Sequence, residues 1–298
     1  MLDFSLHLDN PDQTSFLRPS RYLKGGMSQY PYRMMANAVS KGVRVFAGEA
    51  VLSIDSGMDT RFVIRTEKRT IVADRIINAI DAFAFGKIAG NVARDIQNTK
   101  QFQDLKYTSC ATVDAWWDDR FWERSQLLQG NTLLQISNHD ECFNLMIIPN
   151  YPYVKGSNGT RAAYDDGVCV ETWRDLLNSG NASLLREEIR AGMQRVFTDV
   201  VVPLPRTVKG FVHEQAWYNL GAMSPFNNED IRKWAVRPVS LWDVSMVGEA
   251  YNPAYSSWTE GAIRSTMWTL REKYGFSFPC LEYLDLGALN CASQGSQF

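Results

Sequence analysis

Long apolar runs and an excess of charge of one sign are both missing from this 298-residue sequence. No stretch reaches the roughly 18 consecutive apolar residues that a membrane-spanning helix requires. A formal net charge of −2 gives no sign of the basic surface that would bind nucleic acid or an anionic membrane. With 45% hydrophobic and 21% charged residues, the composition is instead typical of a soluble globular protein with a large core.

Cysteine and histidine are few and scattered. The five cysteines include no C-x-x-C pair and the three histidines show no ligand spacing, which argues against a disulfide framework and against a metal site. This cysteine usage favours a reducing, intracellular compartment, either cytoplasmic or organellar. The N-terminus is too acidic, and its apolar runs too short, for a signal peptide. Asn158-Gly-Thr160 and Asn181-Ala-Ser183 match the N-glycosylation triplet, which also arises often by chance.

Residues 244–275 carry the most specific pattern, a strand followed by a loop and a capped helix. The apolar run Val244–Val247 predicts a strand, and Gly248 ends it. Ser257 and Glu260 stand in the S-x-x-E arrangement that caps a helix start. The apolar residues that follow at helical spacing predict the buried face of that helix: Ile263, Met267, Leu270 and Tyr274.

A corner of this kind suits an electron-rich ligand. The free N–H groups at the start of a helix carry partial positive charge and bind an anion or a carbonyl with negative character. Gly261 and Ala262 in the first turn would let such a ligand approach the backbone closely. The alternative is an ordinary strand-to-helix corner inside a core, because capped helices are common.

The residues of this corner resemble a known flavin motif. Val247-Gly-Glu-Ala-Tyr251 and Ser257-Trp-Thr-Glu-Gly-Ala-Ile-Arg-Ser265 are similar to the C-terminal motif of the FAD-dependent amine oxidases, the family of monoamine, polyamine and L-amino-acid oxidases. Gly25-Gly-Met27 and Asn78-Ala-Ile80 match two further segments in the family's order. The resemblance covers roughly residues 20–275, which correspond to the C-terminal two-thirds of a relative.

The resemblance implies an α/β fold of the mixed α+β kind. An incomplete FAD-binding domain, like that of glutathione reductase, would carry an inserted substrate domain made of a β-sheet and helices. The FAD-binding part would comprise residues 1–90 and 236–275, and the substrate-binding part residues 91–235. Residues 276–298 carry no motif and would form a peripheral tail.

Local patterns predict the elements of both parts. Ser28 should cap a helix that runs to about Lys41, and Ser183 should begin another helix. Runs rich in β-formers predict a meander that ends in a buried strand: Val43–Phe46, Ala50–Ile54, Arg61–Thr66 and Thr70–Ile80. In the substrate part, further strands are expected at 107–113, 127–136 and 143–148.

Cofactor and substrate residues follow from the resemblance alone. The cofactor would be FAD, unless it has been lost, and it would be non-covalent because Met223 stands where monoamine oxidases carry the flavin-bonded cysteine. The implied cofactor-binding residues are Ala50, Val51, Ala79, Gly248, Glu249, Trp258, Thr259, Gly261 and Ala262. The implied substrate-binding residues are Trp117, Trp217, Ala222 and Met223.

Three residues are candidates for a part in catalysis. In many relatives the aromatic residue at the position of Trp258 forms one wall of a substrate cage beside the flavin ring. Relatives often also place a lysine on the strand before a Pro-Phe-Trp corner. Counting back from Trp117 gives Tyr107 at that position, with Lys106 one residue away. A slip of one residue reverses the face of a strand, so the choice between the two stays open.

The glycine-rich turn that cradles the FAD pyrophosphate in this family is not found in the sequence. The family begins with a strand, a G-x-G-x-x-G turn and a helix, and the first 20 residues here contain no glycine. We therefore expect an FAD-dependent amine or amino-acid oxidase portion that takes an N-terminal half or other subunit from another chain, with a small amine or amino acid as substrate. The alternative is a non-catalytic subunit, or pseudoenzyme, that kept the fold without FAD.

Overall fold

The computed structural model describes residues 28–57, 61–128, 133–138, 142–149, 158–252 and 259–277. The chain divides into two compact units, residues 1–50 and 51–298. None of the described helices is long and apolar enough to cross a membrane.

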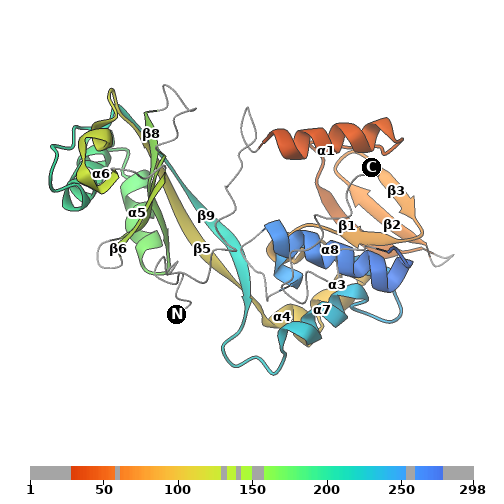
Figure 1. Cartoon of the computed structure of the whole chain (residues 1–298). Coiled ribbons are helices and arrows are strands. Elements are labelled where there is room, and N and C mark those ends of the chain that lie inside the picture. Colours follow the sequence, from red (N-terminus) through yellow and green to blue (C-terminus); the bar gives the residue numbers. More distant parts are fainter. Residues whose placement is uncertain are drawn as a thin grey trace. The chain divides into compact units, whose positions relative to one another are not determined.

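The described part of the first unit contains helix α1 (Gln29–Ser40), close to the predicted bounds (Figure 1). The Ser28 side chain makes no capping hydrogen bond, so the predicted cap is wrong. Gly42 follows two residues after the end of the helix, and its φ of +90° suits a residue without a side chain. The strand expected at 43–46 does not form, because the Val43 N–H turns back to the carbonyl of Ala38 (3.1 Å).

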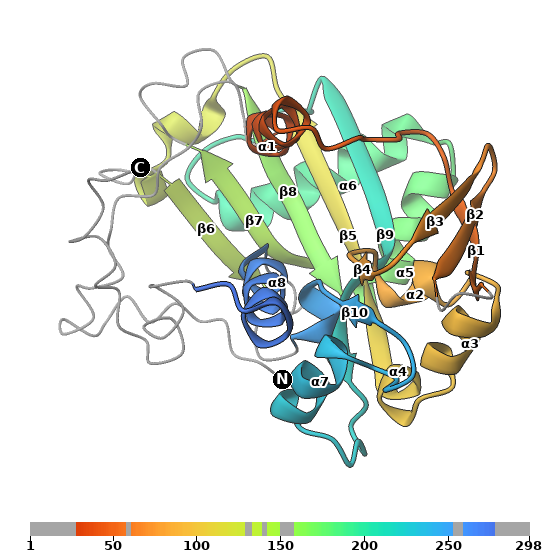
Figure 2. The ribbon, with the colours of Figure 1, turned by 90° about the vertical axis from the view of Figure 1, so that its right-hand side faces the viewer.

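The described residues of the second unit form three sheets, shown in Figures 1 and 2. The strand orders are β1-β2-β3 (antiparallel), β10-β4 (parallel) and β6-β7-β8-β5-β9 (antiparallel). The strands are β1 (Val51–Ser56), β2 (Phe62–Thr66), β3 (Thr70–Ala73), β4 (Ile76–Asn78), β5 (Leu105–Trp116), β6 (Leu133–Asn138), β7 (Phe143–Pro149), β8 (Gly159–Asp166), β9 (Thr207–Leu220) and β10 (Val244–Met246).

Helices connect these sheets and cover them. The α-helices are α2 (Ala82–Phe85), α3 (Asn91–Gln97), α4 (Lys100–Asp104), α5 (Cys169–Asn178), α6 (Ala182–Val196), α7 (Asn228–Val236) and α8 (Thr259–Tyr274). Short 3-10 helices are η2 (Phe121–Arg124), η3 (Gln126–Leu128) and η4 (Glu249–Tyr251). This mixture of sheets and helices confirms the expected α/β class.

The run Thr70–Ile80, expected to be one buried strand, is two short strands in different sheets. β3 pairs antiparallel with β2, whereas β4 pairs parallel with β10. The break falls at Asp74 and Arg75, and Arg75 forms an ion pair with Asp243 (3.1 Å), the residue before β10. The apolar pattern continues across the break, so it does not reveal the change of partner. β3 is also not buried, since Val72 is 57% exposed.

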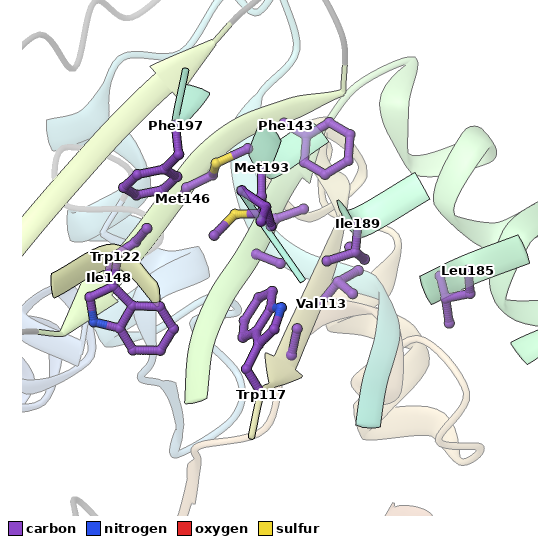
Figure 3. Packing of buried hydrophobic residues seen from close by; sticks show 14 of the residues in the cluster. Val113, Trp117, Trp122, Phe143, Met146, Ile148, Leu185, Ile189, Met193 and Phe197 are labelled. Atoms are coloured by element: carbon purple, nitrogen blue, oxygen red, sulfur yellow. The ribbon is translucent and has the colours of Figure 1, made fainter. Parts of the chain in front are cut away.

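The five-stranded sheet buries one face beneath α5 and α6 (Figure 2). Its core is filled largely by aromatic side chains that meet edge to face, and Figure 3 shows how they pack. Trp117 contacts Phe121 and Trp122 with ring centroids 5.4 and 5.9 Å apart. At α6, the Asn181 side chain accepts a hydrogen bond from the Leu184 N–H (3.0 Å), so the cap is Asn181 rather than Ser183.

A second core lies where β1, β2, α2 and α3 meet α7, β10 and η4. The ends of the two longest strands belong to it, since Leu105 of β5 and Tyr218 of β9 are both buried there. One pair of strands therefore contributes to both cores.

A disulfide joins Cys142, next to β7, to Cys169 at the start of α5. The scattered cysteines argued against such a bond. The two cysteines are 27 positions apart in sequence, so the local pattern does not reveal the contact, which pairing of β7 with β8 and the turn into α5 bring about. Of the described cysteines, Cys110 remains free and buried.

Candidate functional site

The carboxyl ends of the parallel strands β4 and β10 lie side by side. Asn78 pairs with Met246, and the Val247 N–H donates a hydrogen bond to the Asn78 carbonyl (2.8 Å). In α/β proteins, ligands bind in the crevice beyond the carboxyl ends of parallel strands. The turns that follow the two strands, 79–81 and 248–252, are therefore the first candidate for a binding edge.

The second turn begins at Gly248 and packs against α8. Gly248 has φ +146°, and its N–H donates a hydrogen bond to the Ser265 hydroxyl (2.8 Å). Ser265 lies on the buried face of α8 together with Gly261 and Thr269. These small residues let the helix pack closely on η4. The predicted apolar stripe is not the buried face, and Ile263, its first member, is 44% exposed.

Buried polar groups hold the first turn. Tyr251 is fully buried, and its hydroxyl donates a hydrogen bond to the Ile80 carbonyl (3.4 Å). The Asn78 side-chain amide donates to the same carbonyl (3.3 Å). Burial raises the pKa of Tyr251 well above its ordinary value, so the hydroxyl keeps its proton. The two hydrogen bonds to the Ile80 carbonyl thus hold the backbone next to Ala79, which is exposed.

Asp81 and Tyr218 connect this turn to the long strand β9. The Tyr218 hydroxyl donates to Asp81 Oδ1 (2.9 Å) and accepts from the Phe83 N–H (2.9 Å). Asp81 also caps α2 by accepting from the Ala84 N–H (2.8 Å). Burial raises the pKa of Tyr218, so this hydroxyl also stays protonated. The buried Tyr218 phenol therefore links the candidate edge to the five-stranded sheet by hydrogen bonds.

The structure distinguishes Lys106 from Tyr107. Tyr107 packs edge-on against Phe83 (5.9 Å between centroids) and Tyr218 (6.4 Å). Lys106 pairs with Asn219 on the opposite face of the strand, and its Nζ donates to the Gln103 carbonyl (2.9 Å). Since Thr108 pairs with Trp217, Lys106 shares the sheet face that carries Trp217.

Trp117, expected to line the substrate, is wholly buried, and its indole N–H donates to the Pro203 carbonyl (3.0 Å). The corner after β5 instead carries Phe121-Trp122, within η2. This dipeptide is the better match to a Pro-Phe-Trp corner, and the same count of ten residues back from Trp122 reaches Thr112. Counting back from Trp122 instead of Trp117 would therefore have identified Thr112 from the sequence.

Thr112 lies in a hollow on the open face of the five-stranded sheet. Its neighbours Ala111 and Val113 point into the helix-covered core, so Thr112 points the other way. The hollow has a volume of about 250 Å³ and is lined by Cys110, Thr112, Tyr164, His213, Gln215, Ala216 and Trp217. Of the predicted substrate residues, Trp217 is therefore the one that lines it.

Two aromatic rings bound this hollow. Tyr164 of β8 and Trp217 of β9 come from the strands on either side of β5. Their ring planes are nearly parallel (8°), with centroids 6.5 Å apart. Burial raises the pKa of the Tyr164 hydroxyl to about 12 and that of the Cys110 thiol to about 11. The Tyr164 hydroxyl and the Cys110 thiol are consequently both uncharged at neutral pH.

The other predicted residues are spread around these two features. Ala50 and Val51 are exposed at the start of β1, and Ala222 and Met223 lie just after β9, with Met223 94% exposed. Ser257 and Trp258 lie outside the described residues. Within the described ranges, no three His, Cys, Asp or Glu side chains are grouped so that they could hold a metal ion.

The first turn of α8 is described from Thr259 onwards. Thr259 and Glu260 are exposed, Gly261 is buried, and Ala262 is half-buried. Glu260 accepts a hydrogen bond from Arg264 Nε (2.8 Å), so its carboxylate interacts with the next turn of the same helix. Ser257, the other residue of the predicted capping box, lies outside the described residues.

Comparison with known proteins gives one family match. A family model described as flavin containing amine oxidoreductase matches residues 5–266. No match was found among curated proteins. The matched range includes both strand-end turns and the whole five-stranded sheet.

Proposed function

The chain belongs to the flavin containing amine oxidoreductase family, and on this premise we propose that it forms the flavin edge and the substrate lobe of an FAD-dependent amine or amino-acid oxidase. The observation that carries the proposal is the convergence of Asn78–Ile80 with Val247–Tyr251 at the carboxyl ends of β4 and β10. Two motifs separated by more than 160 residues meet at the kind of edge where cofactors bind.

The described residues suit the flavin end of FAD. The backbone at Gly248, Glu249 and Thr259–Ala262 would meet the ribityl chain and the pyrimidine edge, where N–H groups at a helix start favour an electron-rich carbonyl. Ala79 would lie beside the ring, and Ala50 and Val51 would meet adenine. When bound, FAD would supply a two-electron acceptor for oxidation of the substrate C–N bond to an imine, with the electrons passed on to oxygen. With methionine at 223, the attachment would be non-covalent.

The hollow on the five-stranded sheet would receive the substrate. Tyr164 and Trp217 offer two aromatic faces to a flat or cationic group, which they would bind by stacking and cation–π attraction. Thr112 would take the place of the lysine that relatives often use. Lys106 lies on the same face as the hollow and is a better candidate than Tyr107 for a role near substrate. Trp258 remains the proposed wall beside the flavin ring.

The pyrophosphate cradle would come from polypeptide other than these 298 residues. We propose that an N-terminal half carrying the G-x-G-x-x-G turn completes the FAD-binding part, to which residues 1–90 and 236–275 would belong. Parallel sheets are normally covered on both faces. Beside the two-stranded parallel sheet, however, Ile77 is 43% exposed and Ile80 42% exposed, as expected if further chain packs there.

The test is reconstitution. The chain is purified alone and together with a polypeptide that carries the family's glycine-rich N-terminal segment. We expect flavin absorbance, near about 450 nm for a bound oxidised flavin, and hydrogen peroxide release with amines or amino acids only from the pair. Gly248→Ala should lower flavin content, whereas Gly275→Ala, also at positive φ but after the end of α8, should not. Equal flavin loss in the two variants would contradict the proposed edge.

A non-catalytic scaffold is the second candidate function. It is favoured by Thr112, because a threonine in the hollow cannot supply the amine of the lysine that relatives use. A scaffold subunit would show no flavin in either sample and no peroxide with any substrate. Stable association with the N-terminal polypeptide without flavin would establish this second function and exclude the first.

A further inference from the structure

Buried contacts around the disulfide hold its two cysteines together. The sulfurs of Cys142 and Cys169 are 2.10 Å apart and their Cα atoms 5.0 Å apart. The Trp173 indole N–H lies within hydrogen-bonding distance of the Cys142 carbonyl (2.9 Å) and of Asp165 Oδ2 (2.6 Å). Trp173 is 1% exposed and Asp165 is also 1% exposed. The fold itself thus presents the two thiols to each other, and bonds of this kind persist in oxidising compartments.

A second, independent feature of the same lobe is the triplet Asn181-Ala-Ser183. Asn181 lies between α5 and α6 as the N-cap of α6, Ala182 and Ser183 are the first two residues of that helix, and residues 178–184 are all exposed. The Asn181 side chain uses Oδ1 to cap α6, accepting from the Leu184 N–H. Among the described residues, its Nδ2 donates no hydrogen bond. The nitrogen that N-glycosylation modifies is therefore accessible, and the cap does not depend on it.

The other triplet, Asn158-Gly-Thr160, provides an internal contrast. Asn158 Nδ2 donates to the Asp118 carbonyl (3.0 Å), and the Asn158 carbonyl accepts from the Trp117 N–H (3.0 Å). Thr160 is 4% exposed. A single carbon added at Gly159 would lie 2.6 Å from Trp116 Nε1, so the backbone is packed tightly against that indole. A sugar at Asn158 would have to displace this packing.

From these two features we propose that the chain matures in an oxidising, secretory compartment, where Asn181 receives an N-linked glycan and Asn158 does not. The donor would be a lipid-linked pyrophosphoryl oligosaccharide. The bond between Nδ2 and the sugar C1 forms as the bond between C1 and the pyrophosphate oxygen breaks. Nδ2 gives up one proton, and the lipid pyrophosphate leaves. The disulfide forms when both thiols lose their protons and two electrons to a disulfide-exchanging oxidant of that compartment.

The glycan is tested on protein isolated from its own cells and on the full chain secreted by cultured eukaryotic cells behind a cleavable leader. Peptide N-glycosidase converts each occupied asparagine to aspartate, which peptide mapping locates. We expect conversion at 181 and none at 158. Asn181→Gln and Ser183→Ala should each abolish the glycosidase-dependent shift in mobility, whereas Asn158→Gln should leave the shift unchanged.

The disulfide is tested on the same samples by alkylation before reduction. We expect Cys110 to be alkylated after unfolding, while Cys142 and Cys169 appear in one linked peptide. Unmodified Asn181 in the native protein, a glycan at Asn158, or free thiols at both 142 and 169 would each overturn the proposal. Because secretion and occupancy are measured without flavin or substrate, these results do not depend on the proposed oxidase activity.

Discussion

The two cores of this protein are stabilised in different ways. The five-stranded sheet has strands of up to 14 residues and a core of interlocking aromatic rings beneath two helices. The region around β4 and β10 has strands of three residues, and hydrogen bonds that Tyr218 and Tyr251 donate and that Ser265 accepts fix its turns. Packing thus stabilises the five-stranded sheet, the proposed substrate lobe, while polar cross-links stabilise the proposed flavin edge. Four variants or conditions test whether aromatic packing or hydrogen bonding stabilises each region.

The largest effect is expected from Trp117→Ala, which removes a fully buried indole from the aromatic core. Replacing a buried tryptophan by alanine costs about 3–5 kcal/mol, because the cavity does not close. Urea unfolding followed by circular dichroism would show the loss. Trp217→Ala is the matched control, since that ring lines the open hollow, and it should cost far less. Similar losses for both variants would mean that the hollow belongs to the core.

Next in size is loss of the disulfide by Cys142→Ser with Cys169→Ser. Closing a loop of this length stabilises a fold by about 3 kcal/mol. Both cysteines lie beside the five-stranded sheet, so hydrogen exchange should become faster in α5 and β7 but stay unchanged in β10. Cys110→Ser serves as the control for serine substitution. Faster exchange in β10 as well would show that the two cores unfold as one unit.

Tyr218→Phe tests the polar link between the two regions. The variant keeps the ring but removes the acceptor of the Phe83 N–H and the donor to Asp81, which keeps its bond from the Ala84 N–H; the loss costs about 1–3 kcal/mol. Tyr107→Phe is the control, since that ring is 51% exposed. Thermal unfolding of both variants, together with the flavin content of the reconstituted pair, would measure the difference. No difference between them would argue that packing alone fixes the binding edge.

The smallest effect concerns pH. The folded-state pKa of Cys110, raised by burial to about 11, lies above its unfolded value of 9.0. The unfolded chain therefore loses this proton first, and folding stability declines as pH rises from 9 to 11, by an amount on the order of 1 kcal/mol. Cys110→Ala should flatten this part of the curve of unfolding free energy against pH. An unchanged curve would show that the thiol does not contribute.

Predictions from sequence succeeded where a pattern depends only on neighbouring residues. The helix at 29–40, the strands at 51–56, 62–66 and 143–149, and the strand-turn-helix at 244–274 all follow from local composition. They failed where a distant partner decides. The run 70–80 divides because β4 pairs with β10, and α8 buries Gly261 and Ser265 because η4 lies against them. Neither partner is visible in the local pattern.

Sequence by itself determined the family of this protein, because the motif at 247–265 combines glycines at set positions with particular side chains, and such a combination is rare enough to recognise. Tertiary structure alone decided which residues meet. It put Thr112 rather than Trp117 in the hollow, joined Cys142 to Cys169, and linked Asp81 to Tyr218 across 137 positions. The physical reason is that register, strand pairing and burial are properties of the assembled sheets, and a one-residue shift that leaves composition unchanged moves a side chain to the opposite face.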